Sequence, residues 1–96
     1  KTKAVDVVSF QLFKSSSSVA ANYRAVCRGK SSADFLNKLK IVDEEADESL
    51  FWLEFIQGLE LDCDKVQLDK LIKEADELVA IFSAGIKTIK AKNNIK

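Results

Sequence analysis

The chain has no proline and no histidine, and only three of its 96 residues are glycine. Because proline and glycine mark the turns of β-rich proteins, their scarcity argues against a fold of many short strands. Alanine, leucine, lysine and the acidic residues are abundant instead, and these favour helices. A chain of this length forms one domain around a single small core. We therefore predict one all-helical domain over residues 1–96.

The lack of histidine removes the commonest side chain of catalytic and metal sites. It excludes the Glu-x-x-His pairs of di-iron bundles and every histidine-based nucleophile triad. Cys27 and Cys63 do not have metal-like spacing, and we interpret them as reduced thiols. The acids Glu44, Glu45, Asp47 and Glu48 are typical of a solvated helix face. We expect no enzyme activity, no metal or cofactor and no small-molecule substrate.

No apolar run approaches the roughly 18 residues that a membrane-spanning helix needs, and no secretory leader is visible. We therefore expect a cytoplasmic protein without a membrane partner. The formal net charge is zero, but its distribution is uneven. Residues 1–42 hold eight basic and two acidic side chains, residues 43–77 three and thirteen, and residues 78–96 four and none. Such asymmetry suits pairing between helices, between subunits or with a partner.

The stretch from Ser32 to Gly58 has helix signals at both ends. Ser31 or Ser32 can cap the first turn through its hydroxyl, and Gly58 can end the helix in the left-handed conformation. Spacings that alternate between four and three predict a seam for a neighbouring helix. Its residues are Phe35, Leu39, Val42, Ala46, Ser49, Leu53 and Ile56.

A further helix is predicted for residues 64–91, with Asp62 or Asp64 as its cap. Its seam is wide enough to contact two neighbours and comprises Leu68, Leu71, Ala75, Leu78, Phe82, Gly85 and Ile89, widened by Ile72, Val79 and Ile86. In residues 1–30, near-heptad spacing permits one helix that Gly29 would end. The serines at 15–18 weaken that prediction because serine competes for backbone hydrogen bonds, although small side chains also let helices approach closely.

Three segments together resemble one protein family. They are Ser16-x-Ser18-Val19-x-Ala21-Asn22-Tyr23-Arg24-Ala25, Ile41-Val42-x-x-Glu45-Ala46-Asp47-Glu48-Ser49-x-x-Trp52-Leu53-Glu54, and Glu74-Ala75-Asp76-Glu77-Leu78-Val79-Ala80-Ile81-Phe82 followed by Ile86-Lys87-Thr88. In this order they resemble the bacterial four-helix-bundle proteins encoded within intervening sequences of 23S ribosomal RNA genes, over roughly Gln11 to Lys90.

The resemblance implies an antiparallel up-down-up-down four-helix bundle that assembles as a ring-shaped homopentamer. A related branch comprises accessory proteins of diversity-generating retroelements, which bind nucleic acid and a reverse transcriptase. The family has a loop before the segment that resembles Gln11-Leu12, whereas here Phe10 runs directly into Gln11. Either the first helix is truncated or an internal segment is absent between Phe10 and Gln11. We therefore expect a short or interrupted first helix with a chain break or sharp turn there, and helices near residues 2–10, 11–28, 32–57 and 64–91.

Two groups of side chains are candidates for binding. Phe51, Trp52 and Phe55 lie off the seam of their helix, so they either complete the monomer core or form an oligomer interface. The candidate nucleic-acid contacts are Arg24, Arg28, Lys30, Lys87, Lys90 and Lys92. Clustered cations contact phosphates additively, but surface lysines and arginines also serve solubility and helix ends.

These observations favour a non-enzymatic oligomeric scaffold, with RNA or a ribonucleoprotein as its partner. The alternative is a protein-binding or purely structural oligomer without a nucleic-acid partner. For the intervening-sequence proteins themselves, the resemblance implies no established activity.

Overall fold

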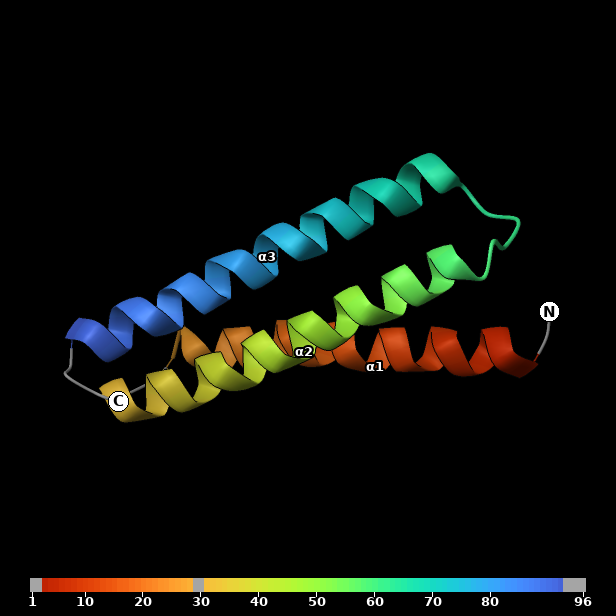
Figure 1. The fold of residues 1–96 in the computed structure, drawn as a ribbon. Coiled ribbons are helices and arrows are strands. Elements are labelled where there is room, and N and C mark those ends of the chain that lie inside the picture. Colours follow the sequence, from red (N-terminus) through yellow and green to blue (C-terminus); the bar gives the residue numbers. More distant parts are fainter. Residues whose placement is uncertain (1–2, 29–30, 93–96) are drawn as a thin grey trace.

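The computed structural model describes residues 3–28 and 31–92, which form three antiparallel helices. They are α1 (Lys3–Val26), α2 (Ser32–Gly58) and α3 (Lys65–Lys92). The helix α2 packs against both of the others and lies between them (Figure 1). The molecule is elongated, with extents of 48 × 20 × 19 Å. Since no strand occurs in residues 3–28 or 31–92, the all-helical prediction is confirmed.

The prediction of four helices with an interrupted first helix is wrong for the described residues. Instead of separate helices near 2–10 and 11–28, α1 runs unbroken through Phe10 and Gln11. No glycine or proline lies between Lys3 and Val26, so nothing in the backbone chemistry ends the helix there. The core-facing spacing also continues across the junction, with Val8 buried and Leu12 half-buried. Two segments therefore join in phase as one helix.

The serine run is satisfied inside α1. The hydroxyls of Ser15, Ser16 and Ser17 each donate to the carbonyl oxygen three residues earlier, at 3.1–3.2 Å. Ser15 is fully buried, and the Ser49 hydroxyl of α2 donates to its oxygen at 2.8 Å. The small side chains thus let α1 and α2 approach closely, and the polar groups that this buries are hydrogen-bonded.

This close approach predicts that Ser15→Leu destabilises the fold. A leucine there must displace atoms of α2 and removes the Ser15 oxygen, one of two acceptors of the Ser49 hydroxyl beside the carbonyl oxygen of Glu45, so we expect a loss of about 1–3 kcal/mol. Urea unfolding followed by circular dichroism measures it. Ser17→Leu is the matched control because Ser17 is exposed in the same run. Equal stability of the two variants would show that α1 and α2 are not packed at Ser15.

The helix starts follow the predicted capping chemistry. Ser31 is the N-cap of α2, and its hydroxyl accepts from the amide of Asp34 at 3.1 Å. Asp64 accepts from the amide of Gln67 at 3.0 Å. The helix α2 does end at Gly58, but Glu60 rather than this glycine takes a positive φ, of 54°. The predicted stop at Gly29 lies outside the described residues.

The core lies where all three helices meet. Its buried cluster consists of Val26, Leu39, Val42, Ala46 and Phe82. The seam predicted on α2 is confirmed, because five of its seven residues are buried: Leu39, Val42, Ala46, Ser49 and Leu53. The seam on α3 is filled only in part. Phe82 is buried, but Leu71 and Leu78 remain 40% and 44% exposed, so one of the two expected neighbours is missing on that side.

Candidate functional site

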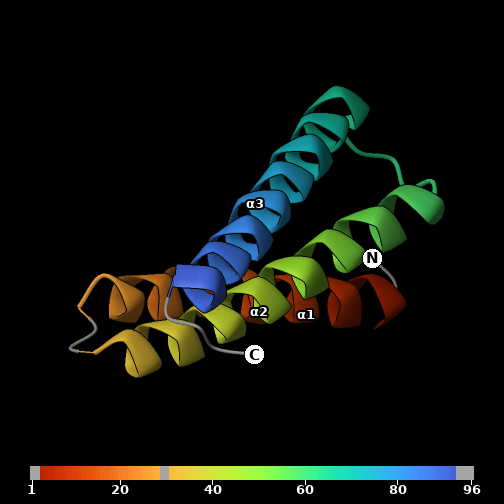
Figure 2. The same cartoon turned by 60° about the vertical axis from the view of Figure 1, so that its left-hand side comes forward.

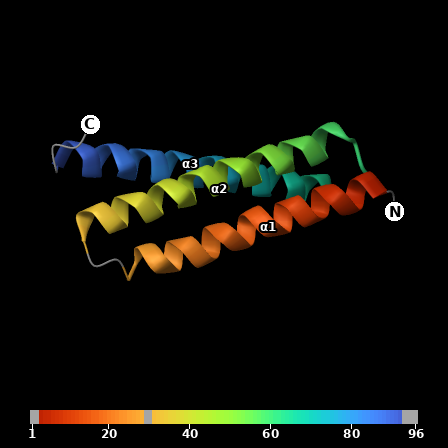
Figure 3. The same cartoon turned by 90° about the horizontal axis from the view of Figure 1, so that it is seen from below.

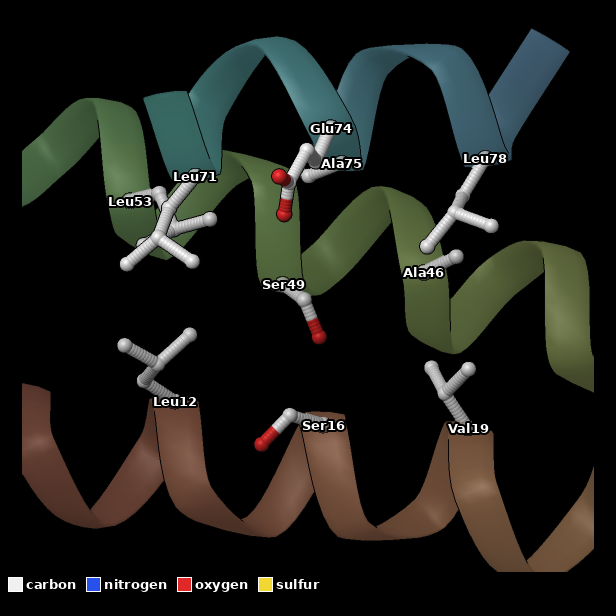
Figure 4. Close-up of a pocket in the computed structure, with 10 residues that line it drawn as sticks. All are labelled: Leu12, Ser16, Val19, Ala46, Ser49, Leu53, Leu71, Glu74, Ala75 and Leu78. Atoms are coloured by element: carbon white, nitrogen blue, oxygen red, sulfur yellow. The ribbon is translucent and has the colours of Figure 1, made fainter. Parts of the chain in front are cut away.

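An apolar groove runs between α1 and α3 with α2 as its floor (Figure 4). Its volume is about 370 Å³. The lining residues are Leu12, Ser16 and Val19 of α1, Ala46, Ser49 and Leu53 of α2, and Leu71, Glu74, Ala75 and Leu78 of α3. The exposed residues of the α3 seam, Leu71 and Leu78, line this groove.

The groove is open because the two outer helices diverge. Near the core, the rings of Tyr23 and Phe82 join α1 to α3 with centroids 5.8 Å apart. Toward Lys3 and Lys65, α3 leans away from α1 (Figures 1 and 2). Viewed from below, α1 and α2 run side by side along most of their length (Figure 3). The space between the diverging parts of α1 and α3 is therefore not filled by another helix of the described residues.

Within the groove, apolar and polar side chains are segregated. Figure 4 shows Leu12, Leu53 and Leu71 together at one end, and Val19, Ala46 and Leu78 at the other. Between these ends lie Ser16, Ser49 and the carboxylate of Glu74. Such a lining suits the face of an amphipathic helix that carries apolar side chains and one cation.

The three aromatic residues predicted as an interface form one cluster on α2. The ring centroids of Phe51 and Trp52 are 4.9 Å apart, and those of Trp52 and Phe55 5.7 Å. Phe51 and Phe55 are 53% and 43% exposed, so the described chain does not bury them in its own core. The indole N–H of Trp52 is buried and has no hydrogen-bond partner in the structure described.

A second exposed apolar surface was missed by the sequence analysis. On the solvent side of α1, Val7, Phe10 and Phe13 are 52%, 62% and 70% exposed. The signal was the pair Val7 and Phe10, three residues apart on one helix face, with Lys3 and Lys14 one turn away on either side of the same face. The expected interruption at Phe10 hid this pattern, because a periodicity across the junction has meaning only in a continuous helix.

The predicted basic residues gather at one end of the molecule. Arg24 lies in the last turn of α1 and Arg28 in the turn that follows it. Lys87, Lys90 and Lys92 lie in the last turns of α3, at the same end in Figure 1. Lys30 lies outside the described residues. The structure thus brings these cations to one end of the molecule.

The whole described molecule is electrically polarised along its length. At the end that holds Val26, residues 22–28, 31–42 and 84–92 contain seven basic side chains and one acidic one. At the opposite end, residues 3–14 and 50–76 contain five basic and eight acidic side chains. The middle of the molecule, residues 15–21, 43–49 and 77–83, contains six acidic side chains and no basic one. The uneven charge noted in the sequence therefore becomes a basic end, with the acidic side chains spread over the middle and the opposite end.

Three further features concern metal binding, the cysteines and membrane insertion. Within residues 3–28 and 31–92, no three Cys, Asp or Glu side chains are grouped as a metal site. Cys27 and Cys63 are free and exposed. None of the helices in the described segments has the length and apolar character needed to cross a membrane.

Comparisons with known proteins place the chain in a family. No protein-family model and no curated protein matches it. A crystal structure from Bacteroides thetaiotaomicron VPI-5482, of a protein of unknown function in the S23 ribosomal protein family, matches with a TM-score of 0.76 and 33% identity. The match covers 84% of this chain and 74% of the Bacteroides chain. At this identity and coverage both the sequence and the fold correspond, and the chain therefore belongs to the S23 ribosomal protein family.

Proposed function

We propose that this protein is a non-enzymatic helical scaffold that self-assembles and binds RNA or a ribonucleoprotein through its basic end. The observation that carries the proposal is the charge polarity of the molecule. At the end that holds Arg24 and Arg28, seven side chains are basic and one is acidic. Each phosphate neutralised there releases counterions, so the contacts add in free energy.

Of the fifteen acidic side chains, only Asp34 lies at the basic end, whereas six lie in the middle and eight at the far end of the molecule. Exposed charges farther apart than the Debye length of about 8 Å at physiological salt are largely screened from one another. The molecule is 48 Å long, so the acidic end has little effect on a phosphate at the basic end. A long RNA would still be repelled from the acidic end, which favours binding end-on.

The assembly part of the proposal is supported by what the monomer leaves open. The groove between α1 and α3, the aromatic cluster on α2 and the outer face of α1 all expose apolar side chains. Surfaces of this kind mark interaction sites in soluble proteins. We propose that another copy completes a four-helix arrangement, in keeping with the resemblance to the proteins of 23S rRNA intervening sequences and their pentameric ring.

RNA binding predicts a specific effect of the double variant Arg24→Gln/Arg28→Gln. If each arginine contacts a phosphate of double-helical RNA, the slope of log K against log salt falls in magnitude by about 2. Fluorescence anisotropy with a labelled structured RNA at several salt concentrations measures this slope.

The matched control is Lys65→Gln/Lys70→Gln, which removes two exposed cations from the acidic end. We expect this variant to bind RNA like the unsubstituted chain. Equal slopes for both double variants would contradict a binding site at the basic end.

A second function, a scaffold that binds only protein, is favoured by the aromatic cluster. Half-exposed Phe51 and Phe55 beside Trp52 resemble the aromatic centre of a protein interface. An assembled protein that shows no salt-dependent RNA binding would support this alternative.

A further inference from the structure

We propose that the groove is filled by the outer stripe of α1 from a second copy of the chain, and that Lys14 of that copy pairs with Glu74. The outer stripe is Lys3, Val7, Phe10 and Lys14. The inference rests on the assembly part of the proposed function and specifies which two surfaces meet. It is distinct from an interface through Phe51, Trp52 and Phe55.

The first support is that both surfaces expose apolar side chains, which the contact would bury. Val7 and Phe10 are 52% and 62% exposed on a helix whose opposite side is already packed on α2. Leu71 and Leu78 are 40% and 44% exposed along the groove. A helix laid between α1 and α3 would bury both sets of side chains, and burial of apolar surface is the main driving force of association.

The second support is length. The groove extends from Leu12 to Val19 on α1 and from Leu71 to Leu78 on α3, which is eight residues, or seven steps of the helix, on each. At about 1.5 Å per residue this is roughly 10 Å, or two helical turns. The part of the stripe from Val7 to Lys14 spans the same number of residues. The stripe and the groove therefore have the same length; with Lys14 at Glu74, midway along the groove, Ser17 of the same helix face lies over the end that holds Leu78.

The third support is the order of polar and apolar groups. In the stripe, Lys14 follows Phe10 by one helical turn. In the groove, Glu74 lies about one turn from Leu71, and leucines 12 and 53 lie beside Leu71 (Figure 4). A phenylalanine placed against these leucines brings the lysine to the carboxylate. The pair selects a helix with a cation at this position over one with an anion.

The outer stripe and the groove lie on different sides of α1, so every copy can use both at the same time. Phe10 lies on the solvent side of α1, whereas Leu12 and Ser16 of the same helix line the groove. One copy can therefore insert its stripe while its groove holds the stripe of another. Such a contact joins two different surfaces, so it generates a ring where the rotation closes.

The test compares variants by light scattering over a range of protein concentrations. Phe10→Asp places a carboxylate among leucines and should weaken association at least about a hundredfold, since it loses the burial of a phenylalanine. Phe51→Asp, at a position that is 53% exposed in the monomer, should weaken it much less. Both residues are more than half exposed, so neither substitution should unfold the monomer.

A charge exchange tests the Lys14–Glu74 pair itself. Lys14→Glu and Glu74→Lys alone should each weaken association roughly fivefold, and the double variant should restore it. Glu44→Lys is the control, because Glu44 is exposed two residues from both Val42 and Ala46 and so points away from the groove.

The outcomes separate this inference from the proposal on which it rests. An assembly that Phe51→Asp disrupts and Phe10→Asp does not would overturn the inference and leave the scaffold standing. A double charge variant no better than the single ones would overturn the Lys14–Glu74 pair. A monomeric unsubstituted protein would overturn both the inference and the assembly.

Discussion

Phe82→Ala is expected to lower the free energy of unfolding by about 3–5 kcal/mol, a large share of what a small domain has. Phe82 is the one residue of α3 in the buried core cluster, which otherwise comprises Val26 of α1 and Leu39, Val42 and Ala46 of α2. Its ring also lies 5.8 Å from that of Tyr23, so it links the outer helices. Truncation leaves a cavity where the three helices meet. Phe82 is the buried residue of α3, so few other contacts hold this helix against the core.

Thermal unfolding by circular dichroism measures the effect of Phe82→Ala, at about 4–8 °C for each kcal/mol in a domain of this size. The neighbouring variant Ile81→Ala is the control, because Ile81 is 62% exposed. We expect Ile81→Ala to change stability by about 0.5 kcal/mol or less. Similar losses for the two variants would mean that α3 is rotated from the orientation described.

Leu53→Ala is expected to cost about 2–5 kcal/mol. Leu53 is 8% exposed and forms the floor of the groove beside Leu12 and Leu71. Its loss removes contacts within the monomer and also part of the surface on which a second copy docks. The measured destabilisation should therefore grow with protein concentration, since association stabilises the folded state by mass action.

Chemical denaturation at two protein concentrations tests Leu53→Ala. Glu54→Ala is its control, because it changes the adjacent exposed position of the same helix. A denaturation midpoint that hardly changes for Leu53→Ala would show that the α2 seam is assigned to the wrong face. A loss that does not depend on concentration would place Leu53 in the monomer core alone.

The sequence predicted α2 well because several independent signals agreed there. Ser31 supplied the cap, and the spacing from Phe35 to Ile56 stayed in phase over the whole helix. The position of Ser15 could not be predicted in the same way. A serine is more often exposed than buried, and the burial of Ser15 depends on the facing Ser49 of another helix as well as on its bond to the carbonyl oxygen of Leu12. That pairing depends on tertiary register, which no local pattern reports.

The error at Phe10–Gln11 has a related cause. The expected break came from comparison with a family pattern, whereas helix continuity depends on the residues actually present. Those residues contain no helix-breaking glycine or proline, and the serines that follow bond to their own helix. Continuity places Phe10 and Lys14 on one exposed face. The groove likewise could not be read from periodicity, because the wide α3 seam does not state how many of its neighbours belong to the same chain.

The most direct test of self-assembly is the molar mass in solution, measured by light scattering for the unsubstituted chain and for Phe10→Asp. Self-assembly predicts a mass several times that of the 10.7 kDa chain, near five times for the ring that the family resemblance implies, and a return to 10.7 kDa in the variant. A mass of 10.7 kDa for the unsubstituted protein at every concentration would show that the chain does not assemble.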